Sequence, residues 1–403
     1  MKCCLIGKTL KHSYSKIIHE KFGEYPYDLV ELKDDEVKDF ILKKEYDAYN
    51  VTIPYKEVVM PYLDKIDDFA LEIGSVNTVV KKDGKLYGYN TDFSGMKYMI
   101  ESAGLSVKDK NVLILGTGGT SKTARAVCKY LKAKNIWVVS RKGELNYSNC
   151  QDLDAEIIIN TTPVGMYPNC FDSPLDITVY KNLEGVVDVI YNPNLTKICF
   201  DAKNLNLKHV NGLSMLVAQA KYAKDYFLGK IGDDLIIEKV TFELAKETEN
   251  IFLIGMAGSG KTTVGRALSK TLNLPFYDTD IEIEKKAKKT IPEIFEENGE
   301  DYFRNLETEV LKELSLKRGA IIATGGGIVK REENLFAIKS NGKAIWIKRD
   351  PNALAVKGRP LSKDVETAKR LYEERKPLYN KFADVIVEND KTIEDTVKEI
   401  ISL

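Results

Sequence analysis

The sequence NIFLIGMAGSGKTTVG, residues 250–265, begins well past the middle of a chain of 403 residues. A short apolar run leads into GMAGSGKT, which matches the pattern G-x-x-x-x-G-K-[ST]. In this pattern glycines allow backbone N–H groups to converge on phosphate oxygens, and the helix that follows directs its positive end at them. The stretch therefore predicts a domain that binds a nucleoside triphosphate and begins near residue 249.

The same pattern assigns individual residues to the triphosphate. Lys261 would reach the β- and γ-phosphates, and the Thr262 hydroxyl would bind Mg²⁺. We expect the triphosphate to be held by Gly258, Ser259, Gly260, Lys261, Thr262 and Thr263.

The overall composition is that of an ordinary soluble protein. Hydrophobic residues make up 43% of the chain and charged residues 30%, and 60 Lys and Arg balance 60 Asp and Glu. This balance argues against a nucleic-acid or polybasic membrane partner. The chain contains no apolar run of about 18 residues, so no membrane span is predicted, and the apolar stretch in MKCCLIG is too short for a secretory signal. We therefore expect a cytoplasmic protein that binds small molecules and can form an oligomer.

Cysteines and histidines form no metal-binding pattern. The six cysteines are scattered without C-x-x-C spacing, which in a reducing compartment favours a role as small hydrophobic residues. The three histidines are too few and too dispersed for a metal site built from histidine. The sequence therefore predicts no site of that kind.

Strand and helix patterns alternate along the first half, which is typical of an α/β fold. Over residues 1–100 the strand-like runs are KCCLIG, YDLVEL, DAYNVTIP and NTVVKKDGKLYGYN, and the helical runs are SKIIHEKFG, EVKDFILKK and LDKIDDFALEIG. Later strands are expected at EIIIN and GVVDVIY, and later helices at SMLVAQAKYAKDYFLG and DLIIEKVTFELAKE. The predicted fold class is therefore α/β.

Residues 111–140 form a second glycine-rich unit, with strand NVLIL, loop GTGGTS, helix KTARAVCKYLKAK and strand NIWVVS. This is the order of a Rossmann dinucleotide-binding unit, in which the pyrophosphate lies at the start of the helix. Gly116 and Gly118 fit the G-x-G-x-x-G pattern, and Ser121 stands at its third glycine position. The residues expected to bind the pyrophosphate are Gly116, Thr117, Gly118, Gly119 and Thr120.

The end of the second strand of this unit indicates which dinucleotide is bound. A carboxylate there would bind a ribose 2′-hydroxyl, but Ser140, Arg141 and Lys142 occupy the position. Two cations without a carboxylate favour a 2′-phosphate, and hence NADP over NAD. A surface turn without a ligand is the alternative that the same residues allow.

Seven motifs in residues 1–247 resemble those of shikimate dehydrogenases and occur in the same order. They are HSYS (12–15), NVTIPYK (50–56), SVNT (75–78), YNTD (89–92), NTTPVGM (160–166), DVIYNP (188–193) and NGLSMLVAQ (211–219). The resemblance implies an α/β substrate domain with an NADP-binding Rossmann domain, and reduction of 3-dehydroshikimate to shikimate by NADPH.

The resemblance also implies residue roles. Lys56 would protonate the developing alkoxide, and Asp92 would orient that ammonium and the substrate hydroxyl. Around the substrate carboxylate, the resemblance implies Ser13, Ser15 and Tyr191. The substrate hydroxyls would be bound by Thr52, Asn77, Asp92 and Gln219. The residues near the nicotinamide would be Val189, Gly212 and Met215. Two departures from the family, Ser214 for a usual Gly and Ser140 for a usual Asn, are expected to tune these sites.

Residues 249–403 resemble a shikimate kinase. The shared motifs after the phosphate loop are FYDTD (276–280), FRNLE (303–307), ATGGG (323–327), GRPL (358–361) and ERKPLY (374–379). The resemblance implies phosphorylation of shikimate to shikimate 3-phosphate by ATP. Asp278 would anchor the water shell of Mg²⁺, and Asp280, on the same side if the segment is extended, would accept the hydrogen bond of the attacking hydroxyl.

The kinase resemblance also implies how shikimate is held. Arg304 and Arg375 would bind its carboxylate through their guanidinium forks, and Gly326 and Gly327 would let the backbone approach its ring. Arg359 would lie in a lid and close on the ATP phosphate being transferred. The segment between Arg359 and Arg375 is short for the family, and Ser362 replaces a usual apolar residue.

These patterns predict a bifunctional enzyme of the shikimate pathway, which leads to chorismate and the aromatic amino acids. We expect a substrate domain over residues 1–100 with 220–247 packing back on it, a Rossmann domain over 101–219, and a P-loop, nucleoside-monophosphate-kinase-like domain over 249–403. One alternative is a quinate dehydrogenase using NAD, fused to a kinase for another metabolite. Another is a non-catalytic sensor of shikimate or quinate, although Lys56, Asp92, Lys261 and Asp280 are all present.

Overall fold

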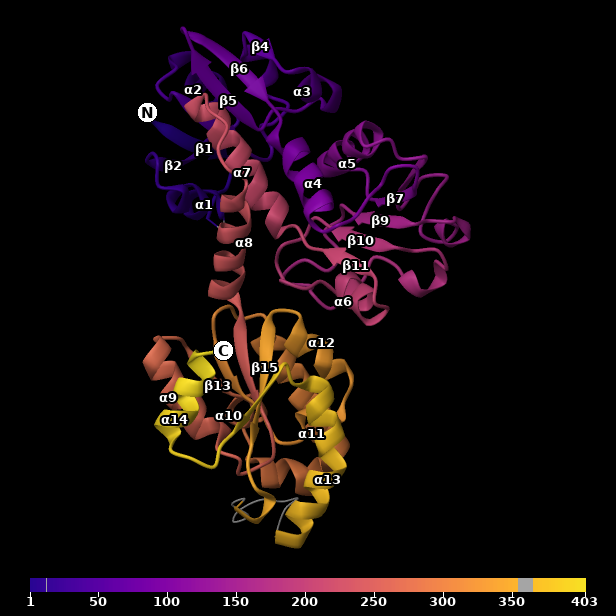
Figure 1. The fold of residues 1–403 in the computed structure, drawn as a ribbon, viewed down its shortest axis with the longest axis vertical. Helices are drawn as coiled ribbons and strands as arrows, with labels where there is room; N and C mark the ends of the chain where they lie inside the picture. The colour runs from indigo at the N-terminus through magenta and orange to yellow at the C-terminus, as the bar shows by residue number, and fades with distance from the viewer. Residues whose placement is uncertain (12, 354–364) are drawn as a thin grey trace. The chain divides into compact units, whose positions relative to one another are not determined.

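The computed structural model describes residues 1–11, 13–353 and 365–403. The described chain forms two compact units, one of Met1–Asn192 with Thr196–Leu244 and one of Pro193–Leu195 with Ala245–Leu403. Three sheets, each combined with helices, make up these units (Figure 1). The predicted α/β class is confirmed.

Six strands form the first sheet of the first unit, in the order β2-β1-β3-β5-β6-β4. The strands are β1 (Cys3–Gly7), β2 (Tyr27–Glu31), β3 (Ala48–Val51), β4 (Lys65–Ile66), β5 (Thr78–Lys82) and β6 (Lys85–Tyr89). β1 is parallel to β2 and β3, whereas β5 is antiparallel to β3 and β6. The sheet is therefore mixed.

Helices cover both faces of this sheet, which is why β1 is buried along its whole length. Side chains alternate between the faces along a strand. Leu5 packs on one face with Phe227 of α7 (Leu213–Leu228), and Ile6 packs on the other with Ile41 of α2 (Val37–Lys43). The remaining helices of this layer are α1 (Ser15–Phe22) and α3 (Asp68–Ile73).

Two predictions for this sheet are wrong in detail. The helix predicted over residues 63–74 begins only at Asp68, because Asp67 is extended and its carboxylate caps the helix by accepting from the Phe69 N–H. The residues before it form β4, which pairs with β6. The strand-like run over residues 77–90 is two strands, because Asp83 and Gly84 both have positive φ and form a hairpin turn.

Five parallel strands form the second sheet of this unit, in the order β11-β10-β9-β7-β8. The strands are β7 (Asn111–Leu115), β8 (Asn135–Val139), β9 (Ile157–Asn160), β10 (Gly185–Asp188) and β11 (Lys208–Val210). Helix α5 (Gly119–Tyr130) lies on one side of it and α6 (Lys197–Asn204) on the other (Figure 1). Since Gly118 is the helix cap, α5 begins earlier than the predicted Lys122, and part of the predicted loop is helical.

Helices α4 (Thr91–Ser102) and α7 join the two sheets of the first unit. α4 contributes Met96 and Ile100 to the core of the second sheet, whereas α7 packs on the first sheet. A Cβ added at Gly95 of α4 would lie 2.8 Å from the Met215 carbonyl oxygen of α7, so glycine is needed for this close approach. Helix α8 (Leu235–Thr248) follows α7.

Five parallel strands form the sheet of the second unit, in the order β13-β14-β12-β15-β16. The strands are β12 (Asn250–Ile254), β13 (Phe276–Asp278), β14 (Ile321–Ala323), β15 (Gly342–Lys348) and β16 (Val385–Glu388). The helices are α9 (Lys261–Leu272), α10 (Thr279–Ala287), α11 (Ile291–Ser315), α12 (Glu333–Lys339), α13 (Val365–Phe382) and α14 (Ile393–Ile401). In Figure 1, α9 and α14 lie on one side of the sheet and α11, α12 and α13 on the other. The carboxyl ends of β12, β13 and β14 therefore meet at one edge.

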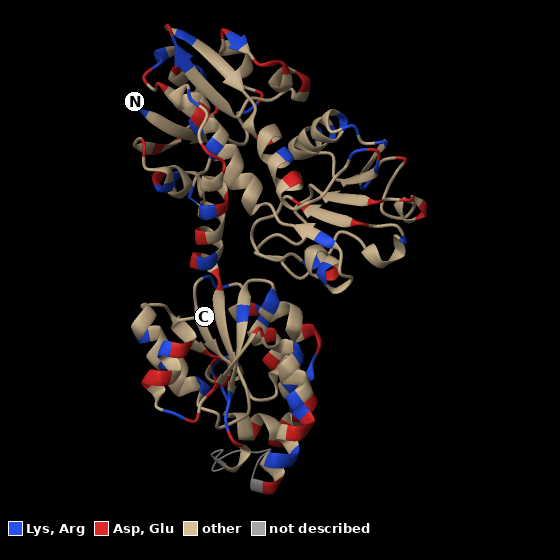
Figure 2. Cartoon of the chain, in the orientation of Figure 1, with Lys and Arg blue, Asp and Glu red and all other residues tan. Residues whose placement is uncertain are grey.

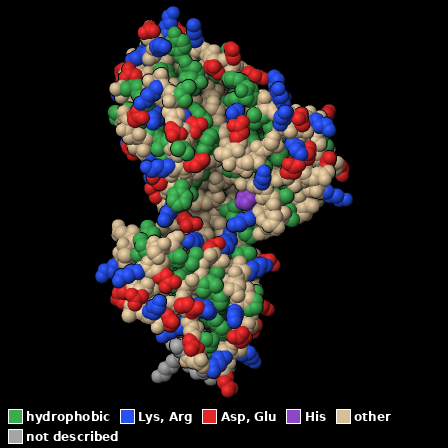
Figure 3. All heavy atoms as spheres, viewed as in Figure 1, with side chains coloured by type: hydrophobic (Ala, Val, Ile, Leu, Met, Phe, Trp, Pro, Cys, Tyr) green, Lys and Arg blue, Asp and Glu red, His purple; other side chains and the backbone are tan. Residues whose placement is uncertain are grey.

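The surface mixes both signs of charge. Lys and Arg are interspersed with Asp and Glu along the helices of both units (Figure 2), and hydrophobic side chains form small patches between them on the face drawn in Figure 3. No helix within the described ranges is long and apolar enough to span a bilayer. All six cysteines are buried free thiols, and burial raises the pKa of Cys128 to about 12. This agrees with their predicted role as small hydrophobic residues.

Asp188, at the end of β10, is a fully buried carboxylate whose pKa is raised to about 6 by burial. The Thr196 hydroxyl donates to it at 2.7 Å, and the Ile190 N–H and the Asn160 amide each donate at 3.1 Å. The folded-state pKa lies above the unfolded value of about 3.9. The folded unit therefore binds more protons than the unfolded chain between about pH 4 and pH 6, and it loses stability as pH rises through this interval.

The substitution Asp188→Asn should remove this pH dependence, because asparagine can still accept from Ile190 while donating to Thr196. Unfolding followed by Trp137 fluorescence in a Trp346→Phe background reports on the first unit alone, since the chain has two tryptophans. Between about pH 4 and pH 7 the variant should gain about 3 kcal/mol relative to its parent. A difference that stays constant over this range would show that Asp188 does not titrate there.

Candidate active sites

A lysine and an aspartate form the centre of the first candidate site. Lys56 Nζ lies 2.5 Å from Asp92 Oδ2, and the two side chains are 27% and 19% exposed. Lys56 follows β3, where the Tyr55 hydroxyl anchors the turn by donating to the Leu32 carbonyl oxygen at 2.6 Å. Asp92 lies in the first turn of α4. An ammonium held by a carboxylate and reachable by solvent can donate a proton to a bound oxygen.

Asn77 is linked to the segments that carry both residues. The neighbouring Val76 N–H donates to the Lys56 carbonyl oxygen at 2.9 Å, and Asn77 Oδ1 accepts from the Thr91 N–H at 2.7 Å. Asn77 is 2% exposed, and its Nδ2 has no hydrogen-bond partner among the described residues. Because a buried unpaired donor is costly, this amide is suited to a ligand oxygen.

The other residues predicted for this substrate come from three segments. Thr52 follows β3, and its N–H donates to the Ile6 carbonyl oxygen at 3.0 Å. Ser13 and Ser15 lie at the start of α1, where Ser13 Oγ accepts from the Ser15 N–H at 3.2 Å.

Tyr191 and Gln219 also have partners within the protein. The Tyr191 ring packs edge-on against Tyr14, with centroids 5.7 Å apart. Gln219, on α7, donates its amide to the Leu216 carbonyl oxygen of its own helix at 2.9 Å. A ligand would have to compete with this bond for the Gln219 amide.

The glycine loop after β7 forms an open cradle. Gly116 has φ 104°, and a Cβ there would lie 2.9 Å from Thr161 Oγ1. These two residues follow the neighbouring strands β7 and β9, between which the strand order of the sheet reverses. A Cβ at Gly118 or Gly119 would meet no atom, so the start of α5 is open to a ligand. This arrangement fits a pyrophosphate at the topological switch point of the sheet. The remaining predicted residues of the loop are Thr117 and Thr120.

The residues after β8 lie at the outer end of this cradle. Arg141 and Lys142 are exposed, and the Ser140 N–H donates to the Leu145 carbonyl oxygen at 3.2 Å. Two unburied cations at the end of the second strand fit a 2′-phosphate.

The predicted nicotinamide end is closely packed. Gly212 caps α7, and a Cβ there would lie 1.9 Å from the Val189 carbonyl oxygen, so only glycine fits. Met215 lies in the first turn of the same helix. Ser214 next to it has a buried hydroxyl that lacks a hydrogen-bond partner within the described ranges.

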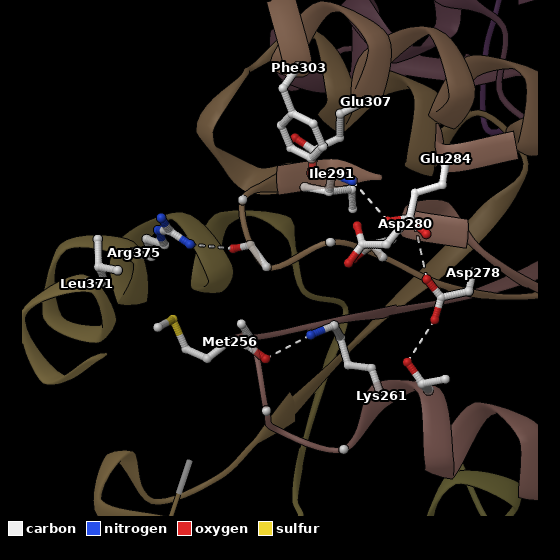
Figure 4. A pocket seen from close by; sticks show the side chains of 18 of the residues that line it. Met256, Lys261, Asp278, Asp280, Glu284, Ile291, Phe303, Glu307, Leu371 and Arg375 are labelled. Carbon is white, nitrogen blue, oxygen red and sulfur yellow. Dashed lines mark hydrogen bonds between the residues drawn. The ribbon is translucent and has the colours of Figure 1, made fainter. Parts of the chain in front are cut away.

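A cavity of about 580 Å³ in the second unit is lined by residues of the phosphate loop and of the motifs FYDTD, FRNLE, ATGGG and ERKPLY (Figure 4). It lies at the sheet edge formed by the loops after β12, β13 and β14. Lys261 Nζ donates to the carbonyl oxygens of Gly255 and Met256 at 2.8 Å each. The lysine is therefore held against the carbonyl oxygens of the phosphate loop. The other predicted loop residues that line the cavity are Gly258, Gly260, Thr262 and Thr263.

The two aspartates of FYDTD are brought together differently from the prediction. The strand ends at Asp278, which caps α10, and Asp280 lies in the first turn of that helix, so the segment is not extended. The Thr262 hydroxyl donates to Asp278 Oδ2 at 2.7 Å, and the Asp280 N–H donates to Asp278 Oδ1 at 3.1 Å. Burial, together with Asp278 and Glu307, raises the pKa of the Asp280 carboxyl to about 6.

Two arginines also line the cavity. Arg304 is 6% exposed, and its Nη1 lies 2.5 Å from Glu307 Oε2. Arg375 donates to the Gly326 carbonyl oxygen at 3.0 Å, and its buried Nε has no partner among the described residues. A Cβ at Gly327 would lie 2.2 Å from Arg304 Nη1, so this glycine is needed for the arginine to pass.

Several residues that line the cavity were given no role from the sequence. Glu307 could have been recognised, because it follows Arg304 by three positions on a helix, a spacing that brings side chains together. A Cβ at Gly325 would lie 2.6 Å from Glu307 Oε1 and 2.8 Å from Asp280 Oδ1, so these two carboxylates converge there. The others are Glu284, Ile291, Pro292, Phe295, Phe303, Arg349 and Leu371. The predicted lid residue Arg359, with Ser362, lies outside the described residues.

The cavity offers two hard oxygen ligands for Mg²⁺, the Thr262 hydroxyl and the Asp278 carboxylate, 2.7 Å apart. Within the described parts of the chain, no group of three or more His, Cys, Asp or Glu could hold a metal by itself. Magnesium keeps several waters and takes phosphate oxygens where it serves a nucleotide. These two side chains fit such a partial coordination shell.

Comparison with known proteins finds relatives for both parts of the chain. Residues 257–403 match the family model for shikimate kinase, and residues 5–79 match that for the shikimate dehydrogenase substrate binding domain. The shikimate dehydrogenase (NADP(+)) of Clostridium beijerinckii is 38% identical over 244 residues, which are 55% of this chain and 89% of that protein.

Solved structures give the same result. A chorismate mutase/shikimate 5-dehydrogenase fusion protein from Clostridium acetobutylicum covers 60% of this chain and 96% of its own, with TM-score 0.58 and 33% identity. Shikimate 5-dehydrogenase from Thermus thermophilus, in complex with NADP(H) and shikimate, covers 60% of this chain and 99% of its own, with TM-score 0.55 and 26% identity. Motifs, fold and relatives together show that this chain belongs to the shikimate dehydrogenase family and joins that dehydrogenase to a shikimate kinase domain.

Proposed function

We propose that Lys56 and Asp92 carry out the proton transfer in the reduction of 3-dehydroshikimate by this bifunctional enzyme. Bound NADPH, which the glycine loop after β7 and Arg141 would hold, would supply the hydride for the C3 carbonyl carbon. The Lys56 ammonium gives a proton to the carbonyl oxygen, which becomes the C3 hydroxyl, and Asp92 holds the ammonium in place. The amine regains its proton from solvent. The observation that carries this proposal is the 2.5 Å contact between Lys56 and Asp92, held close to the unpaired Asn77 amide.

For the second reaction we propose that the hydroxyl made by the first attacks the γ-phosphate of ATP. Asp280 accepts the proton of that hydroxyl as the phosphoryl group moves to its oxygen and ADP leaves. Arg304 and Arg375 bind the substrate carboxylate, and Lys261 moves from its two carbonyl oxygens to the phosphates. Bound Mg²⁺, held by Thr262 and the water shell on Asp278, would neutralise phosphate charge.

We also propose the domain limits 1–100 with 220–247, 101–219 and 249–403, which are supported by one sheet in each. A cytoplasmic location without nucleic-acid or membrane partners is supported by the six buried thiols and the mixed surface charge.

Exchanging the two lysines for alanine should separate the activities. Lys56→Ala should lower kcat for NADPH oxidation about 10²- to 10⁴-fold, the usual contribution of a positioned acid, and leave shikimate-dependent ADP release unchanged. Lys261→Ala should lower ADP release about 10²- to 10³-fold, since it removes a charge from the transferring phosphate, and leave NADPH oxidation unchanged. Each variant is the control for the other, and a variant that keeps its own activity would refute that assignment.

The choice of cofactor should depend on Arg141. Arg141→Ala should raise the KM for NADPH about ten-fold, because it removes a charge-assisted hydrogen bond to the 2′-phosphate. The KM for NADH, which lacks that phosphate, should not change and serves as the control. Equal effects on both cofactors would indicate a structural role for Arg141.

The binding of shikimate by Arg304 should depend much more on Glu307 than on Glu300, the two carboxylates that pair with this arginine. Glu307→Gln removes a partner that is 1% exposed and should raise the KM for shikimate in the kinase reaction at least about ten-fold, since breaking a buried pair leaves an uncompensated charge. Glu300→Gln removes a partner that is 37% exposed and should change this KM by less than about two-fold. Measuring the KM for ATP in both variants separates carboxylate binding from general damage. Equal effects of the two substitutions on the KM for shikimate would contradict this assignment.

A further inference from the structure

The Asn77 amide can face the substrate in one orientation only. Its Oδ1 lies 2.7 Å from the Thr91 backbone nitrogen, which is a donor, so this end must be the acceptor. A carbonyl oxygen has two lone pairs, and the Thr78 hydroxyl lies 3.0 Å from the same Oδ1. Nδ2 is therefore the end that remains free.

The Thr78 hydroxyl is held in turn by a second amide. Asn50 Nδ2 donates to Thr78 Oγ1 and to the Asn77 carbonyl oxygen, both at 3.1 Å. The Asn77 carbonyl oxygen can only accept, which fixes the direction of the Asn50 amide, and the Tyr27 hydroxyl donates to Asn50 Oδ1 at 2.7 Å. Thr78 Oγ1 accepts from Asn50 and donates its own proton to Asn77 Oδ1, which also accepts from the Thr91 hydroxyl at 3.2 Å.

These groups are buried and do not ionise near neutral pH. Thr78 is completely buried, and Tyr27 and Asn50 are 2% and 5% exposed. Burial raises the pKa of Tyr27 well above its usual value and lowers the pKa of His19, which stacks on Tyr27, to about 3. The network therefore acts through geometry alone.

Thr78 is also linked to the helix that carries Asp92. Its Oγ1 lies 3.1 Å from the Thr91 hydroxyl, and Thr91 is the first residue of α4. The Thr78 hydroxyl thus contacts both the Asn77 side chain and Thr91, the residue that starts the helix carrying Asp92.

We infer that Thr78 is a positioning residue for the dehydrogenase reaction: its hydroxyl holds the Asn77 amide with Nδ2 presented to a substrate hydroxyl. The inference rests on the role proposed above for Asn77. Thr78 itself is buried and acts on the substrate only through Asn77.

The test is to replace Thr78 by valine, which has nearly the same shape but no hydroxyl. In the purified full chain, Thr78→Val should raise the KM for 3-dehydroshikimate about ten-fold, the usual effect of losing one buried hydrogen bond. The kcat should change by less than about three-fold and the KM for NADPH should not change, because the hydroxyl affects substrate binding and not the chemical step. Thr78→Ser, which keeps the hydroxyl, should restore the KM.

Thr241→Val is the matched control. Thr241 lies on α8 of the same unit, and its buried hydroxyl has no partner among the described residues. The same chemical change there should leave the KM for 3-dehydroshikimate unchanged. If Thr78→Val does not fold, Thr78→Ala can be compared with Thr78→Ser, which differs from it only by the hydroxyl. The KM for 3-dehydroshikimate should then be about ten-fold higher in Thr78→Ala.

A double-mutant cycle decides whether Thr78 acts through Asn77. Asn77→Ala should raise the KM by itself, and adding Thr78→Val should raise it less than about two-fold further. Additive effects, or an unchanged KM in Thr78→Val while Asn77→Ala raises it, would overturn the inference. If Asn77→Ala itself leaves the KM unchanged, the proposed role of Asn77 fails, and the inference fails with it.

Discussion

Both nucleotide sites of this enzyme depend on one property of the α-helix, whose first backbone N–H groups have no partner within the helix. A parallel strand delivers the chain to that point in each case, β7 before α5 and β12 before α9. Glycines form each connection because the backbone must turn sharply and leave room for phosphate. The same local solution therefore serves a dinucleotide in one unit and a triphosphate in the other.

The two glycine loops differ in how firmly the surrounding protein holds them. A Cβ at Gly118 would meet no atom, whereas a Cβ at Gly260 would lie 2.4 Å from Asn389 Nδ2. That amide donates to the Ser259 carbonyl oxygen at 2.7 Å, and its Oδ1 accepts from the Thr396 hydroxyl at 3.0 Å. The phosphate loop is thus held through its Ser259 carbonyl by Asn389, which follows β16.

The two chemical sites also differ in their exposure to solvent. The Lys56 and Asp92 side chains are both partly exposed, so a proton lost to the substrate is readily replaced from water. In the kinase cavity Glu307 is 1% exposed and Asp280 is half-buried, and burial raises the pKa of both carboxyls. Arg304 partly offsets the cost of burying Glu307, since the two side chains form a buried ion pair.

The sequence by itself determined the α/β class, both phosphate-binding loops and the order of the motifs. These features depend on local patterns, namely apolar periodicity, glycine positions and the residues directly beside them. Features that depend on distant contacts could not be predicted in the same way. The short α3 requires β4 to pair with β6, and the sharing of Asp278 between Thr262 and α10 requires three separate segments to meet.

The orientation of Asn77 is the clearest case of what only the tertiary structure decided. The motif SVNT predicts an asparagine at the substrate, but an amide has two ends that a sequence cannot distinguish. The choice is made by the Thr91 backbone N–H, which can only donate, and the Thr78 hydroxyl, held by Asn50 from another strand, donates to the same oxygen. Hydrogen bonds between residues far apart in the chain therefore determined which end of Asn77 remains free for the substrate.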